Sequence, residues 1–432
     1  MKQMADSRRA GARTRADAGA SVPAIALDLS DLFHHIGRGP VTGITRVAIA
    51  YLEHCLTLER PVFGFVRHAG YALVLDRTAM ALFAREMTGR RHWQRPGLRD
   101  RLRPGLLPEQ RRALSALRNH ALASSGLRST SRLIRRFLPA GSVVLLIGLA
   151  NIHRSAMAEF AANGLAPVVM IHDTIPLDFP QYVVKGGYGW FEERLRNVGA
   201  RAALVLYNSA QTEQDAKAHF ARLGRVPPGV VAHLGVPYLC PAPQELPAGF
   251  DRSSPYFVVL GTIEGRKNHA LLLDLWENMA RADAKPLPRL LIVGTRGWSN
   301  ADFFRRLDAS PLAGTVVKEM PGLSDGAVAA LIAGARGLLF PSHAEGYGLP
   351  AIEAAALGTP VVANDLPVFR EFLGDYAILI PVNEPGRWQR AIEALAQGGR
   401  QGKEPPPLPS WEAHFATVFA AIDALYSPEA RQ

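Results

Sequence analysis

The densest group of residues that could do chemistry lies in residues 341–358, PSHAEGYGLPAIEAAALG. It follows a short apolar run, passes through a glycine turn and enters a helical pattern, with Pro350 in the first turn and Gly358 as a stop. Glu345 precedes the turn and Glu353 lies early in the helix. A helix N-terminus favours an anion, and carboxylates accept hydrogen bonds from vicinal hydroxyls. The segment therefore predicts a site for a polyhydroxylated, anionic ligand, with helix-capping or dipole-stabilising Glu side chains as the alternative.

A second group is the segment GTIEGRKNH, residues 261–269, which directly follows an apolar run. Arg266 and Lys267 are adjacent cations in a glycine-containing turn. An Arg fork and a Lys point charge suit a diphosphate, whereas a solvated surface turn is the plain alternative. Taken together, the two segments offer cations for phosphate and carboxylates for sugar hydroxyls.

The first half of the chain offers weaker candidates. The segment TGITR, residues 42–46, opens an apolar-periodic helix after a glycine-containing loop that includes Gly43. His172 and Asp173 end an apolar run, and a structural histidine is the alternative for His172. Asn208 and Ser209 end the next run, where helix capping is the expected role.

These candidates must be positioned by a framework of strands and helices. Short runs rich in Val, Ile and Leu alternate with helical patterns, as in buried parallel strands joined by crossover helices. Six runs fall in each half of the chain, so we expect an α/β protein with two doubly wound domains. The runs are residues 24–29, 61–66, 142–147, 167–171, 203–207 and 230–234, then 256–260, 289–293, 315–318, 337–340, 360–363 and 377–380.

The domain boundaries follow from changes in this rhythm. A Pro-rich stretch without periodicity separates the two sets of runs and reads as a linker. The final helix has a single apolar face and is expected to pack on the first domain. The expected parts are a disordered tail (1–21), an N-terminal domain (22–236), a linker (237–254), a C-terminal domain (255–409) and a final helix (410–428).

The net charge of +11 is confined to one part of the N-terminal domain. Residues 85–136 hold 14 Arg, no Lys and three acidic residues, so this segment accounts for the whole excess. Its Leu pattern predicts a helical excursion between two strands. Only Trp93 could stack on a base, which argues against a nucleic-acid-binding protein. Two interpretations of this segment remain: it binds an anionic membrane surface, or it is a solvated helical hairpin.

The two chemical segments together resemble the donor-binding domain of retaining glycosyltransferases of family 4, which have the GT-B fold. The resemblance covers nearly the whole chain and is most specific over residues 256–375. It implies that Glu353 holds the ribose hydroxyls of a nucleotide, that Glu345 contacts the transferred sugar, and that Arg266 and Lys267 bind the diphosphate. The glycine turn between the two Glu residues would also bind substrate, through Gly346, Tyr347, Gly348 and Leu349.

The same resemblance gives roles to the N-terminal candidates. Gly43 would belong to a glycine loop near the diphosphate and the acceptor, and His172 with Asp173 to a loop near the anomeric carbon. Arg296, Gly297 and Trp298, after another strand, are placed near the donor pocket, with a packing role as the alternative for Trp298. Residues 320–323 are placed near the nucleobase. His343 departs from the residue common in the family.

The expected reaction needs no cofactor beyond a nucleotide-diphosphate sugar as donor substrate. The sequence has no DxD, HExxH, Walker A or GxGxxG pattern, so no metal site is expected. Retention would proceed by attack on the face from which the diphosphate departs.

The resemblance extends to bacterial enzymes that build exopolysaccharide, capsule or lipopolysaccharide. It implies a lipid-linked saccharide or growing polysaccharide as acceptor, mannose from GDP-mannose as the preferred donor, and a cytoplasmic enzyme peripheral on the inner face of the membrane. The alternatives are a non-catalytic sugar-nucleotide-binding scaffold and a basic nucleic-acid-binding protein.

Overall fold

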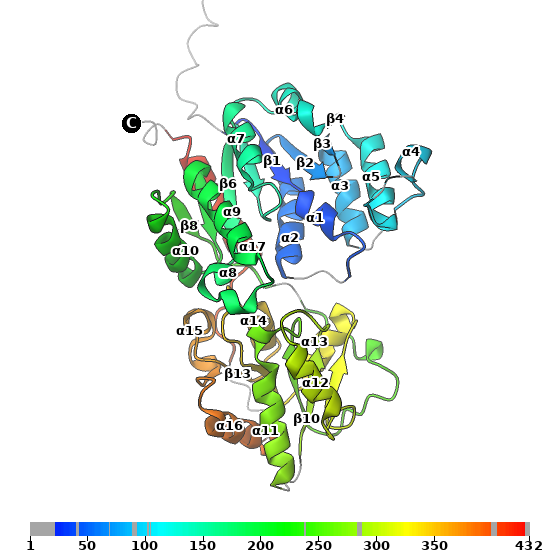
Figure 1. Cartoon of the computed structure of the whole chain (residues 1–432), viewed down its shortest axis with the longest axis vertical. Coiled ribbons are helices and arrows are strands. Elements are labelled where there is room, and N and C mark those ends of the chain that lie inside the picture. The colour runs from blue at the N-terminus through cyan, green and yellow to red at the C-terminus, as the bar shows by residue number, and fades with distance from the viewer. Residues whose placement is uncertain are drawn as a thin grey trace, which may run out of the picture.

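The computed structural model describes residues 22–39, 43–68, 70–88, 93–101, 103, 105–236, 239–282, 287–398 and 404–427. The expected tail (1–21), Thr42 and the first two linker residues lie outside this set. The described chain forms two α/β domains stacked along its long axis (Figure 1). Each of the twelve apolar runs overlaps a strand, which confirms the predicted fold class.

The N-terminal domain has a mixed sheet with the described strand order β4-β3-β2-β1-β5-β6-β7-β8. All neighbouring strands are parallel except β2–β3 and β3–β4. Its strands are β1 (Ile25–Asp28), β2 (Val62–His68), β3 (Tyr71–Leu75), β4 (Ala123–Gly126), β5 (Val143–Leu146), β6 (Ala166–Ile171), β7 (Leu204–Tyr207) and β8 (Gly229–Val231). Its helices are α1 (Ser30–His35), α2 (Gly43–Thr57), α3 (Arg77–Met87), α4 (Leu98–Arg101), α5 (Pro108–His120), α6 (Thr130–Phe137), α7 (Arg154–Ala162), α8 (Ile175–Asp178), α9 (Gly187–Arg201) and α10 (Ala210–Arg222).

The C-terminal domain has a parallel sheet with the described order β11-β10-β9-β12-β13-β14. Strand β9 lies at its centre, and the chain order reverses between β9 and β12. The strands are β9 (Tyr256–Leu260), β10 (Arg289–Val293), β11 (Val317–Met320), β12 (Gly337–Phe340), β13 (Val361–Ala363) and β14 (Ile378–Leu379). The helices are α11 (His269–Arg281), α12 (Ala301–Ala309), α13 (Asp325–Gly334), α14 (Leu349–Ala356), α15 (Pro367–Leu373) and α16 (Pro385–Gln397).

The Arg-rich segment differs from the expected helical excursion. Besides α4, α5 and α6, it contains strand β4, which pairs antiparallel with β3 at the edge of the sheet. The sequence of β4, Ala-Ser-Ser-Gly, alternates between partly buried and exposed residues. An edge strand of this kind needs backbone pairing but no apolar run, and so it leaves no hydrophobic signal.

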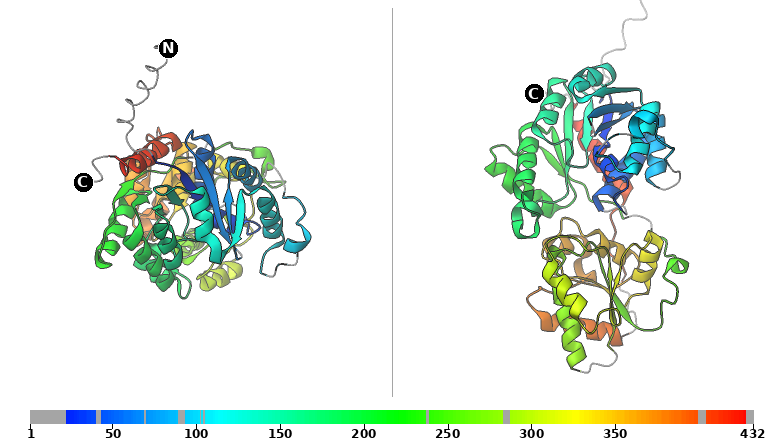
Figure 2. Two further views of the ribbon diagram at one scale, coloured as in Figure 1. Left: turned by 90° about the horizontal axis from the view of Figure 1, so that it is seen from above. Right: turned by 45° about the vertical axis from the view of Figure 1, so that its right-hand side comes forward.

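The last helix, α17 (Trp411–Ala424), packs on the N-terminal domain although it follows the C-terminal one (Figure 2). The His54 ring stacks on the Phe415 ring at a centroid distance of 3.8 Å. Tyr51 of α2 and His414 share a buried hydrogen bond of 2.8 Å, and burial lowers the pKa of His414 to about 4. The chain thus crosses between the domains twice.

Candidate functional site

A cavity of 2190 Å³ lies between the two domains. Ligand pockets are usually about 300–1,000 Å³, so this cavity has room for two substrates. Its walls come from both domains and include the candidate residues Gly43, His172, Asp173, Arg266, Lys267, Glu345, Gly346, Tyr347, Gly348, Leu349 and Glu353. The structure therefore brings all the predicted catalytic and substrate-binding residues to one cavity.

The two chemical segments meet at the point where the strand order of the C-terminal sheet reverses. Arg266 and Lys267 lie in a 3₁₀ turn (Gly265–Lys267) after β9, and Glu345 follows the neighbouring strand β12. Open α/β sheets bind ligands in the crevice at such a switch point, outside the carboxyl ends of the strands. Gly261, with φ of 136°, lets the chain turn beside the Lys267 stem, which passes 3.4 Å from the position of a Cβ there.

Arg266, Lys267 and Glu345 form a compact buried charge cluster. Lys267 Nζ donates to Glu345 Oε1 at 2.6 Å, and Arg266 Nη1 lies 3.0 Å from the same oxygen. Arg266 also bonds Glu264 at 2.7 Å and the carbonyl of Ala344 at 2.6 Å. The side chains of Lys267 and Glu345 are 11% and 8% exposed. Two cations are therefore held in place where a diphosphate could replace the carboxylate as their partner.

The charges of this cluster set its protonation states. Burial would raise the pKa of Glu345, but the charges of Lys267 and Arg266 outweigh it and hold that pKa at about 2. Burial lowers the pKa of Lys267, and Glu345 opposes this effect. Glu345, Glu264 and Asp173 together outweigh the burial of Arg266 and raise its pKa. Glu345 therefore stays ionised over the physiological range.

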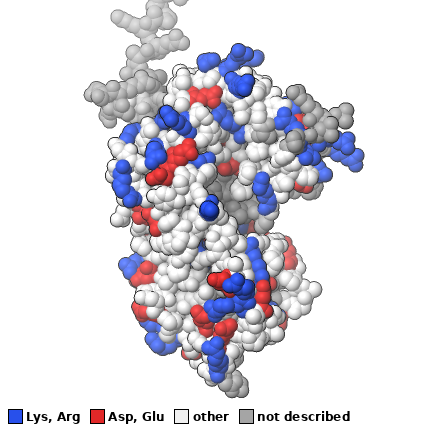
Figure 3. Space-filling view, in the orientation of Figure 1, with Lys and Arg blue, Asp and Glu red and all other residues white. Residues whose placement is uncertain are grey.

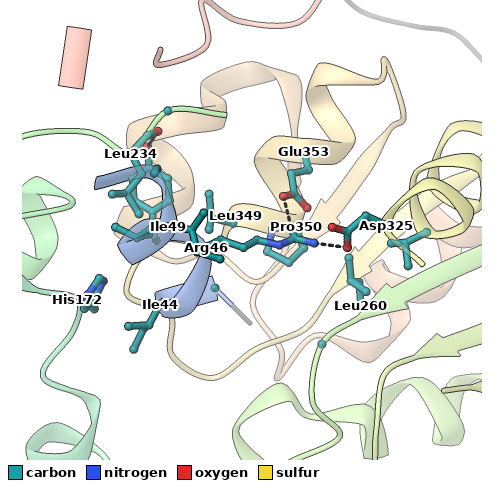
Figure 4. Close-up of a pocket in the computed structure, with 18 of the residues that line it drawn as sticks. Ile44, Arg46, Ile49, His172, Leu234, Leu260, Asp325, Leu349, Pro350 and Glu353 are labelled. Carbon is teal, nitrogen blue, oxygen red and sulfur yellow. Dashed lines mark hydrogen bonds and ion pairs between the residues drawn. The ribbon is translucent and has the colours of Figure 1, made fainter. Parts of the chain in front are cut away.

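Glu353, in the first turns of α14, is a second charged group of the cavity wall, separate from the Arg266–Lys267–Glu345 cluster. Gly348, with φ of 84°, precedes this helix, and Pro350 occupies its first turn. Arg46 of α2 crosses from the N-terminal domain and donates to Glu353 Oε1 at 3.0 Å and to Asp325 Oδ1 at 2.6 Å (Figure 4). Burial raises the pKa of Glu353 to about 7, although Arg46 opposes the rise.

His172 and Asp173 face the cluster from the N-terminal domain. His172 Nε2 lies 2.8 Å from the carbonyl of Ile147, and burial lowers the pKa of the imidazole. Since a carbonyl can only accept, Nε2 carries the proton and the neutral ring keeps an acceptor at Nδ1. Burial raises the pKa of Asp173, and Arg266 is the largest opposing influence.

The glycine turn is also a contact between the domains. A Cβ at Gly346 would lie 2.3 Å from the carbonyl oxygen of His172. Thr212 Oγ1 donates to the Gly346 carbonyl at 3.2 Å, and Tyr347 OH donates to the Leu234 carbonyl at 2.6 Å. Tyr347, which we predicted to bind substrate, thus borders the cavity with its hydroxyl already bound by the other domain.

Some of the remaining candidate residues lie where the sequence predicted, and others do not. Ser209 caps α10 as expected, since Thr212 N donates to its Oγ at 3.0 Å. Asn208, for which the sequence also predicted capping, instead donates to the His172 carbonyl at 2.8 Å. The expectation for Arg296 was wrong, because Asp308 and Glu319 hold its side chain on the surface of the domain. Trp298 lines the cavity and is 49% exposed. Met320, Gly322 and Leu323 also line it.

The sequence did not single out Tyr182 or Asp325, and it did not predict that Arg46 pairs with Glu353. Tyr182 stacks on His343 of the other domain with ring centroids 5.4 Å apart and planes at 11°. Such contacts depend on how the domains face one another, so no local pattern signals them. Arg46 lay inside the TGITR motif, but its carboxylate partners come from α13 and α14.

The described residues contain neither a metal-binding group nor a membrane-spanning helix. No group of three or more His, Cys, Asp and Glu side chains in this part of the chain is arranged to hold a metal ion. No described helix is long and apolar enough to cross a membrane.

Comparison with known proteins agrees with this geometry. Residues 247–404, which carry both chemical segments, match the family model Glycosyl transferases group 1. The chain is 30% identical over 246 residues to the serotype-specific mannosyltransferase WbdA of Escherichia coli, covering 54% of this chain and 30% of that protein. It is also 30% identical over 129 residues to the O-antigen chain mannosyltransferase B of Escherichia coli, covering 30% and 33%. The chain thus spans about a third of the length of these relatives.

Solved structures share the architecture at low sequence identity. Anabaena Alr3699/HepE in complex with UDP and glucose gives a TM-score of 0.57 at 15% identity, covering 93% of this chain and 97% of that one. Sucrose-phosphate synthase from Thermosynechococcus elongatus gives 0.54 at 16% identity, covering 93% and 96%. This likeness shows the fold: two Rossmann-like domains facing a cleft, the GT-B arrangement predicted from the sequence.

Proposed function

We propose that this chain, with its GT-B fold and its match to Glycosyl transferases group 1, is a retaining glycosyltransferase of family 4. It moves a hexose, with mannose favoured, from a nucleotide-diphosphate sugar to a lipid-linked saccharide or polysaccharide in bacterial polysaccharide biosynthesis. The observation that carries this proposal is the buried Arg266–Lys267–Glu345 cluster, which shares one interdomain cavity with Glu353.

In the proposed mechanism, the donor diphosphate takes the place of Glu345 as the partner of Arg266 and Lys267. Their buried charges then stabilise the negative charge that develops on the departing diphosphate. Glu345, now released from Lys267, accepts hydrogen bonds from hydroxyls of the sugar. The protein's own cations perform this stabilisation, so the proposed reaction uses no metal ion.

Retention follows if the acceptor enters on the face from which the diphosphate leaves. The bond between the anomeric carbon and the phosphate oxygen breaks, the bond to the acceptor oxygen forms, and the acceptor proton passes to the departing phosphate oxygen. The neutral imidazole of His172 aligns the acceptor through Nδ1. Tyr182, which lines the cavity, stacks on His343 of the other domain, so the two rings hold the domains together beside the site.

The choice of sugar and acceptor rests on the relatives. WbdA and mannosyltransferase B are mannosyltransferases by name, and the second acts on an O-antigen chain. These two names favour mannose as the sugar that this chain transfers.

A panel of donors tests the proposed activity. We expect purified protein to transfer or slowly hydrolyse one nucleotide-diphosphate sugar, with GDP-mannose preferred over UDP-glucose and GDP-fucose. Release of nucleoside diphosphate, followed by mass spectrometry of the glycosylated product, measures it. Binding of nucleotide sugars without turnover in the presence of a polysaccharide or lipid-linked acceptor would favour the scaffold instead.

We also propose a cytoplasmic location with peripheral contact to anionic lipid. Arg128, Arg132, Arg135 and Arg136 are exposed on and before α6, beside exposed Leu127. Helix α6 lies at the end of the N-terminal domain away from the C-terminal domain, where basic side chains gather (Figures 1 and 3). Contact through this face would hold the enzyme at a membrane while the cleft stays open to solvent.

Flotation with liposomes tests this contact. We expect the protein to float with vesicles containing 30% phosphatidylserine at low salt and to lose most of this binding when the α6 face is neutralised. The change replaces Arg128, Arg132, Arg135 and Arg136 by Ser, and the control replaces the exposed Arg281, Arg305, Arg370 and Arg387 of the other domain. Equal flotation of both variants and the unaltered protein would contradict the proposal.

A further inference from the structure

Arg46, on α2 of the N-terminal domain, reaches across the cavity to the C-terminal domain. Its guanidinium lies between two carboxylates of the C-terminal domain, 3.0 Å from Glu353 and 2.6 Å from Asp325 (Figure 4). The side chain of Glu353 is 5% exposed, whereas that of Asp325 is 78% exposed. The buried carboxylate depends on this cation much more than the exposed one does.

The surroundings of Glu353 contain few other charges. Among the described residues, Glu353 is the one charged residue of α14. The charged groups that face it are Arg46 from α2 and Asp325 from α13, and these two act in opposite directions. The two helices approach each other near this pair, since a Cβ built at Gly43 of α2 would lie 4.0 Å from the Leu349 side chain of α14.

We propose that Arg46 is a positioning residue for the nucleoside of the donor, holding the Glu353 carboxylate in place to accept the ribose hydroxyls. This inference rests on the proposed function, which assigns the ribose to Glu353. Arg46 bonds Oε1 and leaves Oε2 to the ligand. The same hydrogen bond joins the N-terminal domain to Glu353, the residue proposed to bind the ribose. Arg46 therefore contributes both to donor binding and to the approach of the two domains.

The electrostatics of this pair give Arg46 a distinctive signature. The pKa of Glu353 is raised to about 7 by burial even with Arg46 present. The ionised form, which accepts charge-assisted hydrogen bonds, exists above this pKa and is lost as pH falls through it. Removing Arg46 must therefore move the ionisation of Glu353 to higher pH. Removing the negative charge of Asp325 must move this ionisation to lower pH.

Ribose recognition as a function of pH tests the proposal. The readout is the ratio of dissociation constants for GDP and 2′-deoxy-GDP, and for UDP and 2′-deoxy-UDP, measured by calorimetry between pH 5.5 and 9.0. A hydrogen bond to a charged group contributes about 1.5–3 kcal/mol, so the unaltered protein should favour the ribonucleotide about tenfold or more at pH 8.5. This preference should fall as pH drops through 7.

The variants separate positioning from a purely structural role. Arg46→Met should move the midpoint of ribose preference upward by at least one pH unit, Asp325→Asn should move it downward, and Arg46→Lys should restore most of the original profile. The control is Arg296→Met, because Arg296 is 40% exposed, pairs with two carboxylates, Asp308 at 3.0 Å and Glu319 at 2.9 Å, and does not line the cavity. It should leave the profile unchanged.

The outcomes distinguish this inference from the function on which it rests. If Arg46→Met keeps the original midpoint, or weakens ribose preference equally at every pH, Arg46 does not act through Glu353 and the inference is wrong. If the unaltered protein binds neither GDP nor UDP, the proposed function itself fails.

Discussion

Replacing Lys267 with Met should reduce sugar transfer at least 100-fold while nucleotide binding weakens much less. Lys267 is buried, held 2.6 Å from Glu345, and lies with its ammonium 4.6 Å from the centre of the Phe340 ring. A charge in such a site is fixed before the reaction and needs no reorganisation as the diphosphate departs. Removing one such electrostatic contact typically costs about 10²–10³ in kcat. Initial rates under saturating donor and acceptor measure the loss.

A second variant distinguishes loss of catalysis from loss of stability. Met at position 267 leaves Glu345 with Arg266 as its remaining partner in the cluster, and breaking a buried pair costs about 3–5 kcal/mol. The double variant Lys267→Met, Glu345→Gln removes both charges and should melt closer to the unaltered protein while remaining inactive. Transfer at the original rate by either folded variant would show that the cluster does not perform the chemistry.

Replacing Gly346 with Ala should nearly abolish transfer by forcing the two domains apart at the site. Gly346 does not have a positive φ, so Ala meets no backbone strain there. Its Cβ would, however, lie 2.3 Å from the His172 carbonyl oxygen and 2.8 Å from Asp173 Cβ. Real Cβ atoms do not approach backbone so closely, so the loops must separate. A misplacement of about 1 Å can cost about 100-fold in rate.

The matched control is Gly189→Ala, on the exposed face of α9. No heavy atom lies within 4 Å of a Cβ built there, and the position is helical. It should leave the rate unchanged and stabilise the protein slightly, since Ala costs about 1 kcal/mol less than Gly in a helix. Unaltered transfer by Gly346→Ala, with a melting temperature equal to that of the control, would contradict the interdomain site.

Most strands could be predicted because burial leaves a signal in the sequence, although the apolar, buried β3 was not among the predicted runs. The central parallel strands are covered on both faces and read as continuous apolar runs, such as Phe257 to Val259 in β9. The edge strand β4 has no such requirement, which explains why it was missed within the Arg-rich segment. The partly missed β11 shows the same effect, because its residues beyond Val317 are only partly buried.

The site was predictable where its residues are contiguous in sequence. Arg266 and Lys267 follow one strand that ends at the cleft, and Glu345 and Glu353 follow its neighbour. Their positions in the sequence therefore bring the two pairs to the same edge of the sheet. The contacts of Arg46, Tyr182 and Tyr347 could not be predicted in this way, because they join elements of different domains. Arg296 shows the converse error: it follows a strand, but Asp308 and Glu319 hold it outside the cavity.

The most direct test is a crystal structure of this chain bound to a nucleoside diphosphate. The account predicts the diphosphate within hydrogen-bonding distance of Arg266 and Lys267, with Glu345 released from the Lys267 ammonium. It also predicts the ribose hydroxyls on Glu353, with Arg46 still bonded to that carboxylate. A nucleotide bound elsewhere, or one that leaves the Lys267–Glu345 pair intact, would contradict the account.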